Sequence, residues 1–396
     1  MLANMYHRWL NNSFLRFIAL STLLGLTMLF RMRGAVLRLT PDASYDIFSE
    51  ARNQAFSSIF SFADGYLSLL PRAMAHIIVI APIEYTAFFS IMFTSLFWVI
   101  AGVIVAYCVK AEVKNSYWAV AAAIMVALAP GARESSLGNI GNVRWQVFIM
   151  LAVAGSSYAF VAKFPKTFLS IALVTGLSHP LAVLATIPIL ISFLNADARR
   201  QRSRVVALVI VGCTFLVQAS IHLRLGRGAI RGGITHWWSN PPIFWWFNWL
   251  APIVLAIFVA VIAIVVYKFG KSNSTMAVSL ALTSFAIGSV SWVQGGIADR
   301  YFVVPTVLSW CALVLLFVNI RTYLPKLSSL IFLSIALVFA FACFKWFGPS
   351  SYLNSGPTWQ SEVTRLRAVC KENPTEIVQA TLSAGVAEIR CKNLTD

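Results

Sequence analysis

Carboxylates and arginines gather between Arg31 and Tyr85, directly after the first long apolar run. This stretch holds five of the chain's 14 carboxylates and five arginines, although only 11% of all residues are charged. A carboxylate can take a proton from a hydroxyl group, and a guanidinium matches two phosphate oxygens at once. Together these groups suit the transfer of a group from a lipid phosphate to an alcohol. They are Asp42, Asp46, Glu50, Asp64 and Glu84, with Arg31, Arg33, Arg38, Arg52 and Arg72.

Three short segments carry the remaining candidate residues. Segment 63–72 is bracketed by Asp64 and Arg72, segment 133–145 is rich in hydrogen-bonding groups and ends in Trp145, and segment 299–305 begins with Asp299 and Arg300. For any one of these residues alone, helix capping or interfacial anchoring is the better explanation. The set favours a site because separate predicted loops each offer an arginine while one offers several carboxylates.

The elements that position these residues are predicted to be membrane-spanning helices. The mean hydropathy is +0.77, and apolar runs of membrane-spanning length recur along the chain. Helices satisfy their own backbone hydrogen bonds in a bilayer, and the strand-type alternation of a membrane barrel is missing. The net charge of +17 comes from basic residues scattered in short loops. This pattern predicts contacts with membrane lipids and cytoplasmic anchoring rather than a nucleic-acid partner.

The positive-inside rule sets the predicted topology. Residues 14–30 are interpreted as an uncleaved first span with a cytoplasmic N-terminus, which places the first loop (residues 31–87) outside. Within this loop, residues 45–62 are predicted to form an amphipathic helix on the membrane surface. Lysines and arginines recur at every second boundary of the later spans. Those spans are predicted at 88–109, 116–132, 146–162, 205–223, 244–267, 276–294, 302–320 and 327–347.

Residues 167–194 need a different interpretation. The run is too long for one simple span, and basic residues flank it on both sides. It is therefore predicted to form two short helices that turn at residues 176–180 and pack against other helices. This gives an all-α polytopic protein of about 11 transmembrane helices whose C-terminus lies outside.

The polar tail is predicted to be a small extracytoplasmic α+β domain. The chain divides into a transmembrane domain, residues 1–347, and this tail, residues 348–396. A helix over 359–370 and a hairpin of strands 377–383 and 386–391 are expected in the tail. Cys370 and Cys391 are its two cysteines, and a disulfide between them suits an oxidising compartment.

With these features the chain resembles the GT-C glycosyltransferases. The resemblance lies in the uncleaved first span, the long acidic first outer loop, the short paired helices near the middle and the small outer C-terminal piece. It covers most of the chain at the level of architecture. The family uses polyprenyl-phosphate sugars as donors, with a first-loop carboxylate as general base and later Arg, Lys or His residues holding the donor phosphate.

Carried onto this sequence, the resemblance implies Asp42 or Asp46 as the base, with Asp64 as the third choice. Asp42 and Asp46 are separated by Ala-Ser-Tyr and so do not form an Asp-x-Asp motif. This departure leaves open which carboxylate is the base and whether the reaction requires a divalent metal. The five histidines show no ligand spacing, and no other cofactor is implied. The expected phosphate ligands are Arg72, Arg144, His179 and Arg300, and the expected substrate contacts are Asn142, Trp145 and Tyr301.

The resemblance thus implies an inverting glycosyltransferase of a bacterial cytoplasmic membrane, which transfers sugar to a cell-envelope glycan or lipid acceptor. An O-antigen or polysaccharide polymerase or ligase is the alternative. In that case the catalytic residues would lie in the loop at 224–246, which contains Arg224, Arg227, Arg231 and His236. A lipid-linked sugar flippase or transporter would instead show charged residues inside spans and repeated halves.

Overall fold

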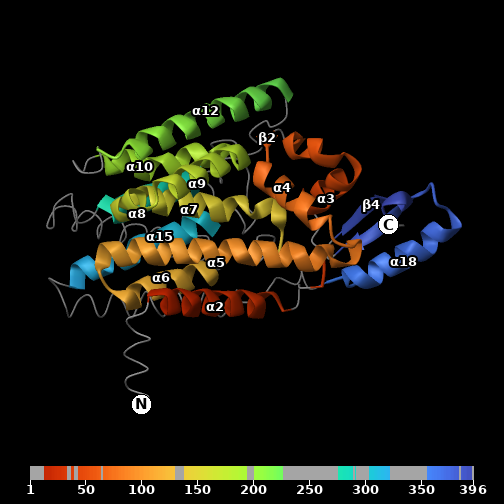
Figure 1. Cartoon of the computed structure of the whole chain (residues 1–396), viewed down its shortest axis with the longest axis horizontal. Coiled ribbons are helices and arrows are strands. Elements are labelled where there is room, and N and C mark those ends of the chain that lie inside the picture. The colour runs from red at the N-terminus through yellow and green to blue at the C-terminus, as the bar shows by residue number, and fades with distance from the viewer. Residues whose placement is uncertain are drawn as a thin grey trace, which may run out of the picture.

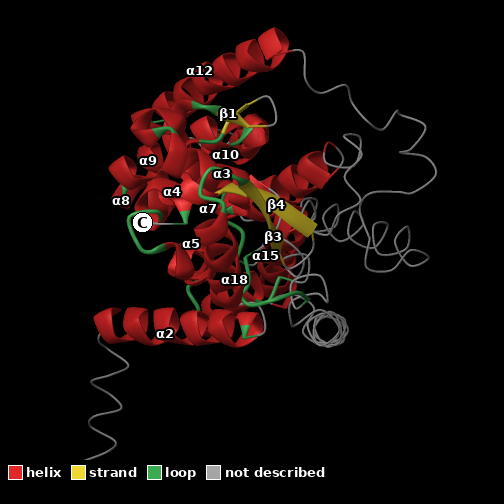
Figure 2. Ribbon diagram, turned by 90° about the vertical axis from the view of Figure 1, so that its right-hand side faces the viewer, coloured by secondary structure: helices red, strands yellow, loops and turns green. Residues whose placement is uncertain are grey.

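The computed structural model shows a helical bundle with the first loop and the C-terminal tail gathered at one end, which we call the loop end (Figure 1). Seen along the bundle from this end, the tail lies in front of the helices (Figure 2). The structure describes residues 13–33, 37–39, 43–63, 66–129, 138–193, 200–225, 275–288, 290, 303–321, 355–382 and 385–394.

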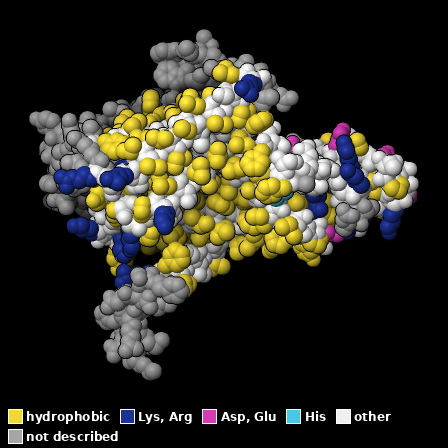
Figure 3. Space-filling model, turned by 45° about the horizontal axis from the view of Figure 1, so that its top comes forward, with side chains coloured by type: hydrophobic (Ala, Val, Ile, Leu, Met, Phe, Trp, Pro, Cys, Tyr) yellow, Lys and Arg dark blue, Asp and Glu magenta, His cyan; other side chains and the backbone are white. Residues whose placement is uncertain are grey.

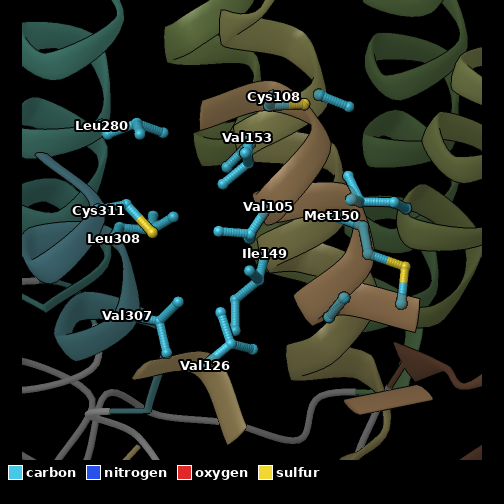
Figure 4. Close-up of a cluster of buried hydrophobic side chains, with 14 of the residues drawn as sticks. Val105, Cys108, Val126, Ile149, Met150, Val153, Leu280, Val307, Leu308 and Cys311 are labelled. Carbon is cyan, nitrogen blue, oxygen red and sulfur yellow. The ribbon is translucent and has the colours of Figure 1, made fainter. Parts of the chain in front are cut away.

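The helices of the bundle form from the apolar runs of the sequence. Their buried side chains make one continuous apolar core, in which Val105, Ile149 and Leu308 come from three different helices (Figure 4). The helices are α2 (Ser13–Met32), α5 (Thr86–Val113), α6 (Ser116–Ala127), α7 (Arg144–Ser156), α8 (Tyr158–Lys163), α9 (Pro165–Ser178), η5 (Pro180–Thr186), α10 (Ile187–Ser192), α12 (Arg202–Leu225), Thr275–Gly288 and α15 (Val303–Arg321).

The surface of the bundle suits a membrane environment. Apolar side chains cover the middle of the face shown in Figure 3, and lysines and arginines lie toward both of its ends, with Asp and Glu side chains beside them at the tail end. Within the described residues, two helices are long and apolar enough to cross a bilayer, Ile83–Val113 and Arg202–Arg224, and five further apolar helices are shorter. The predicted spans 244–267 and 327–347 lie outside the described residues, so the count of about 11 stays a prediction.

The paired short helices predicted within residues 167–194 are present. Helix α9 runs to the loop end, the chain turns at His179 and Pro180, and η5 and α10 return. The Arg204 side chain at the start of α12 donates hydrogen bonds to Ser192 Oγ of α10 (2.6 Å) and to the Ser157 carbonyl oxygen (3.1 Å). These contacts confirm that the run ends on the side of the bundle where it begins.

The predicted span at 146–162 is wrong as a single helix. The chain breaks at Ser157, whose backbone is extended, into α7 and α8. The Ser157 hydroxyl oxygen accepts a hydrogen bond from the Phe160 N–H (3.3 Å) and so caps the second helix. A serine that bonds to nearby backbone groups in this way competes with continuation of the helix.

The first loop folds into a compact unit. Its predicted helix over 45–62 is present only in part, because α3 ends at Asn53 and η1 follows. The Asn53 amide donates a hydrogen bond to the Ser49 carbonyl oxygen (2.7 Å) at this end. A hairpin that pairs Phe62 with Leu67 leads into α4. The elements are α3 (Ala43–Asn53), η1 (Ala55–Phe60), β1 (Phe62–Ala63), β2 (Tyr66–Leu67), α4 (Leu69–Ile78) and η2 (Ile83–Tyr85).

The tail contains α18 (Trp359–Glu372) and the antiparallel strands β3 (Ile377–Leu382) and β4 (Gly385–Arg390). A disulfide joins Cys370 to Cys391, and a cross-link closing a loop of this size stabilises a fold by roughly 3 kcal/mol. The tail does not pack by itself. Buried residues of α18, β3 and β4 form one apolar core with α3, α4 and η2 of the first loop.

Candidate functional site

The candidate site surrounds Arg144, the first residue of α7. The guanidinium carbon of Arg144 lies 5.3 Å from the centre of the Tyr66 ring and 5.5 Å from that of the Trp145 ring. A guanidinium this close to an aromatic ring is attracted by the ring's negative face. Arg144 is half-buried, and α7 begins at the loop end. The site therefore presents a partly exposed cation close to two aromatic rings.

His179 forms the second side of the site, in the turn between α9 and η5. Its ring centre lies 4.5 Å from that of Trp145, and only 3% of the residue is exposed. Its Nδ1 accepts a hydrogen bond from the Leu181 N–H (3.0 Å), so the neutral ring carries its proton on Nε2. Burial, and next the charge of Arg144, lower the pKa of His179 well below its ordinary value. A neutral imidazole with an Nε2–H donor therefore stands beside Arg144.

The β1–β2 hairpin of the first loop brings Tyr66 to Arg144. Ala63 and Tyr66 are paired across the hairpin. Two polar side chains of the bundle hold the segment that follows: the Gln218 amide bonds to both backbone groups of Leu67, and Ser178 Oγ accepts from the Leu70 N–H (3.0 Å). Asp64 lies outside the described residues, but its described neighbours in the sequence belong to this hairpin.

Arg72 is placed inside the first loop. The residue is 1% exposed, and its guanidinium forms an ion pair with Glu50 and donates to the Ser58 carbonyl oxygen (3.0 Å). Ser58 Oγ also lies 2.7 Å from His76 Nε2, and burial followed by the charge of Arg72 lowers the pKa of His76. Arg72 thus ties α3 to α4, while its Nε and Nη2 have no hydrogen-bond partner among the described residues.

The other expected site residues divide into two groups. Asn142 and Trp145 are buried near the start of α7, Asn142 in the short helix η4 (Ile140–Asn142). The second group is not placed by the structure: Asp46 lies in α3 without a described side chain, and Asp42, Asp64, Arg300 and Tyr301 lie outside the described residues. Within the described part of the chain, no group of three His, Cys, Asp or Glu side chains is arranged to hold a metal ion.

Sequence reasoning did not single out Gln218 or Ser178. Gln218 is a lone amide between apolar neighbours in a predicted span, and Ser178 lies within the expected turn at residues 176–180. A polar side chain inside a membrane helix is costly without a partner and is therefore a signal in itself. That signal could have identified Gln218.

The comparisons with known proteins bear on the fold. No known protein family matches the sequence, and no curated protein matches it. Among solved structures, the chain is similar to the archaeal oligosaccharyltransferase AglB from Archaeoglobus fulgidus, determined in complex with an inhibitory peptide and a dolichol-phosphate. The match has a TM-score of 0.50 and 14% sequence identity, and it covers 90% of this chain.

The match extends over 58% of the AglB chain, so this protein spans little more than half the length of that enzyme. At 14% identity the likeness concerns the fold alone. The two chains share the arrangement of their elements at this coarse level. The comparison therefore shows a shared fold, and not a shared activity.

Proposed function

We propose that this protein is a membrane glycosyltransferase that takes a sugar from a polyprenyl-phosphate donor and transfers it to a cell-envelope glycan or lipid acceptor on the extracytoplasmic face. The observation that carries the proposal is the placement of Arg144 beside His179 and Tyr66 at the loop end. The fold shared with an oligosaccharyltransferase supports the same class of reaction.

The proposed reaction is an inverting displacement. A first-loop carboxylate (Asp42, Asp46 or Asp64) takes the proton of the acceptor hydroxyl, whose oxygen attacks the anomeric carbon. The bond between this carbon and the phosphate oxygen breaks, and polyprenyl phosphate leaves with the bonding electrons. Arg144 and the His179 Nε2–H stabilise the charge that develops on the departing phosphate. Arg72 and Arg300 are kept as further candidate phosphate ligands, and Asn142 and Tyr301 as substrate contacts.

The first test measures transfer of radiolabelled sugar from a panel of polyprenyl-phosphate sugars by the purified protein. Arg144→Ala is expected to lower the rate by about 10²-fold, the usual cost of removing one donor to a developing charge. Arg144→Lys restores the positive charge without the planar fork and should recover only part of the loss. Arg390→Ala, an exposed arginine of the tail, serves as the matched control and should transfer at the wild-type rate.

The same assay identifies the base. Asp42→Asn, Asp46→Asn and Asp64→Asn keep the side-chain shape but remove the proton acceptor, and one of them is expected to abolish transfer. The assay with and without a chelator decides whether a divalent metal takes part. Normal transfer in all three variants would contradict a first-loop base. Loss confined to Arg227→Ala, Arg231→Ala and His236→Ala would favour the polymerase or ligase function instead.

A further inference from the structure

Gln218 is a buried amide in the membrane-spanning part of α12. The residue is 2% exposed, and its neighbours in the sequence, Leu216, Val217, Ala219 and Ser220, are apolar or small. A primary amide offers two donors and one acceptor oxygen. Because a bilayer supplies no water for these groups, a side chain like this is retained only when the protein satisfies it.

The partners of Gln218 come from two other elements. Its Oε1 accepts from the Leu67 N–H (2.8 Å), and its Nε2 donates to the Leu67 carbonyl oxygen (3.0 Å) and to the Gly176 carbonyl oxygen (3.2 Å). The Gln218 side chain thus forms hydrogen bonds with both the N–H and the carbonyl oxygen of Leu67 in β2, as the backbone of a neighbouring strand would. The residues that meet, Leu67 and Gln218, are 151 positions apart in the sequence.

The approach of α9 to α12 makes this contact possible. A Cβ atom added to Gly176 would lie 2.1 Å from Thr214 Oγ1, so only glycine allows the two helices to lie this close. The Gly176 carbonyl oxygen then comes within reach of Gln218. Two residues later, Ser178 Oγ at the end of α9 accepts from the Leu70 N–H. The ends of α9 and α12 together form a seat for the hairpin.

The hairpin needs such a seat. It consists of two strands of two residues each, β1 and β2, and so short a two-stranded ribbon is not stable by itself. Tyr66, whose ring centre lies 5.3 Å from the Arg144 guanidinium carbon, is the residue next to Leu67 in β2. Any displacement of Leu67 would move the Tyr66 ring away from the Arg144 guanidinium.

We propose that Gln218 is a positioning residue that holds the β1–β2 hairpin on the ends of α9 and α12 and thereby sets Tyr66 against Arg144. The catalytic consequence of this role rests on the proposed function. The contact itself does not, and it can be measured in a protein whose substrate is still unknown.

The first measurement is hydrogen–deuterium exchange of the full-length protein in lipid nanodiscs. Gln218→Leu removes the amide but keeps an apolar side chain, and exchange in peptides covering residues 66–70 is expected to rise about tenfold, because Leu67 loses its acceptor. Gln201→Leu is the matched control: the same change near the other end of α12, where the Gln201 Nε2 donates to the Tyr158 carbonyl oxygen (3.1 Å). It should leave exchange at 66–70 at the wild-type rate.

The second measurement uses Gln218→Glu and pH. A protonated carboxyl group offers one acceptor and one donor and so replaces most of the amide, whereas the ionised form faces two carbonyl oxygens and repels them. The pKa of a carboxyl group buried there is raised. The variant should therefore keep wild-type protection at 66–70 at acid pH and lose it as pH rises, relative to wild type at each pH.

Activity gives the third readout. Gln218→Glu should transfer sugar at acid pH and lose transfer as pH rises, a pH profile that a merely destabilised protein would not show. If the wild-type protein transfers no sugar from any donor, the proposed function is wrong. Hydrogen–deuterium exchange at residues 66–70 still tests whether Gln218 positions the hairpin. Unchanged exchange at 66–70 in Gln218→Leu, or protection in Gln218→Glu that does not depend on pH, would overturn the positioning role.

Discussion

His179 shows how one residue combines structural and chemical roles. Its Nδ1 caps η5 by accepting from the Leu181 N–H, and its ring packs on Trp145. The cap fixes the tautomer, which leaves the Nε2–H as the hydrogen-bond donor of the ring. Because burial and Arg144 lower the pKa of His179, the ring stays neutral in the folded protein at neutral pH.

The lowered pKa predicts a pH dependence of stability. In the unfolded chain His179 takes up a proton below its ordinary pKa of about 6.5, while the folded protein resists protonation, so stability is lost as pH falls below that value. One such group contributes at most about 1.4 kcal/mol per pH unit. In His179→Asn the side chain can still accept from the Leu181 N–H at the start of η5, but it has no group that titrates in this pH range. The fall in Tm between pH 7 and pH 5 should therefore be smaller for this variant than for wild type. An equal loss in both proteins would contradict a neutral, buried His179.

At the scale of elements, Trp359 joins the two ends of the first loop to the tail. Its backbone N–H donates to the Leu37 carbonyl oxygen (2.7 Å), and its indole Nε1–H donates to the Ile83 carbonyl oxygen (2.7 Å). Leu37 follows α2 and Ile83 precedes α5, so one residue bridges the entry and exit of the loop. Nearby, Arg367 of α18 forms an ion pair with Glu84. The first loop and the tail therefore act as one structural unit.

This bridge predicts that changing the tail loosens the first loop. Trp359→Ala removes a buried indole and is expected to cost about 3–5 kcal/mol, whereas Trp359→Phe leaves the Ile83 carbonyl oxygen without its donor and should cost about 1–3 kcal/mol. Limited proteolysis should then cleave within residues 37–85 faster in both variants, with Trp359→Ala the faster of the two. Gln360→Ala, an exposed neighbour on α18, is the control. Cleavage at the same rate in Trp359→Ala and Gln360→Ala would show that the tail does not hold the loop.

At the scale of the whole molecule, the two ends of the bundle are predicted to face opposite sides of a membrane. Helix α5 ends with Lys110 in its last turn and Lys114 at its C-cap, and α8 ends with Lys163. Both helices end at the side of the bundle away from the tail (Figure 1). The positive-inside rule predicts that this end is cytoplasmic and that the tail, with its disulfide, is extracytoplasmic. The folded state would then place the candidate site at the outer surface.

Labelling in intact cells measures this orientation. Glu376→Cys lies on the exposed surface of the tail, and Lys166→Cys on the exposed first turn of α9 at the opposite end. In a background with Cys343 and Cys213, the exposed free cysteine within the described part of the chain, both changed to Ser, a membrane-impermeant maleimide should modify Glu376→Cys and leave Lys166→Cys unmodified until the cells are permeabilised. The reverse pattern would place the candidate site on the cytoplasmic side and contradict the proposed donor chemistry.

Much of the local structure was determined by the sequence itself. The apolar runs predicted α2, α5 and α12, the basic flanks of residues 167–194 predicted the paired short helices, and the tail pattern predicted a helix followed by a hairpin. These predictions depend on composition over short windows, which reports local burial and secondary structure directly. The break at Ser157 was missed because a single side-chain cap decides it within an otherwise apolar run.

Only the tertiary structure decided which polar groups meet. Arg72 and Arg144 were equivalent candidates in the sequence, yet Arg72 pairs with Glu50 inside the first loop while Arg144 lies against Tyr66 and His179. The seat of the hairpin joins Gln218 to a residue 151 positions away. Such contacts depend on how the helices pack and on where each loop lies against them. The short-range periodicity of the sequence predicts neither.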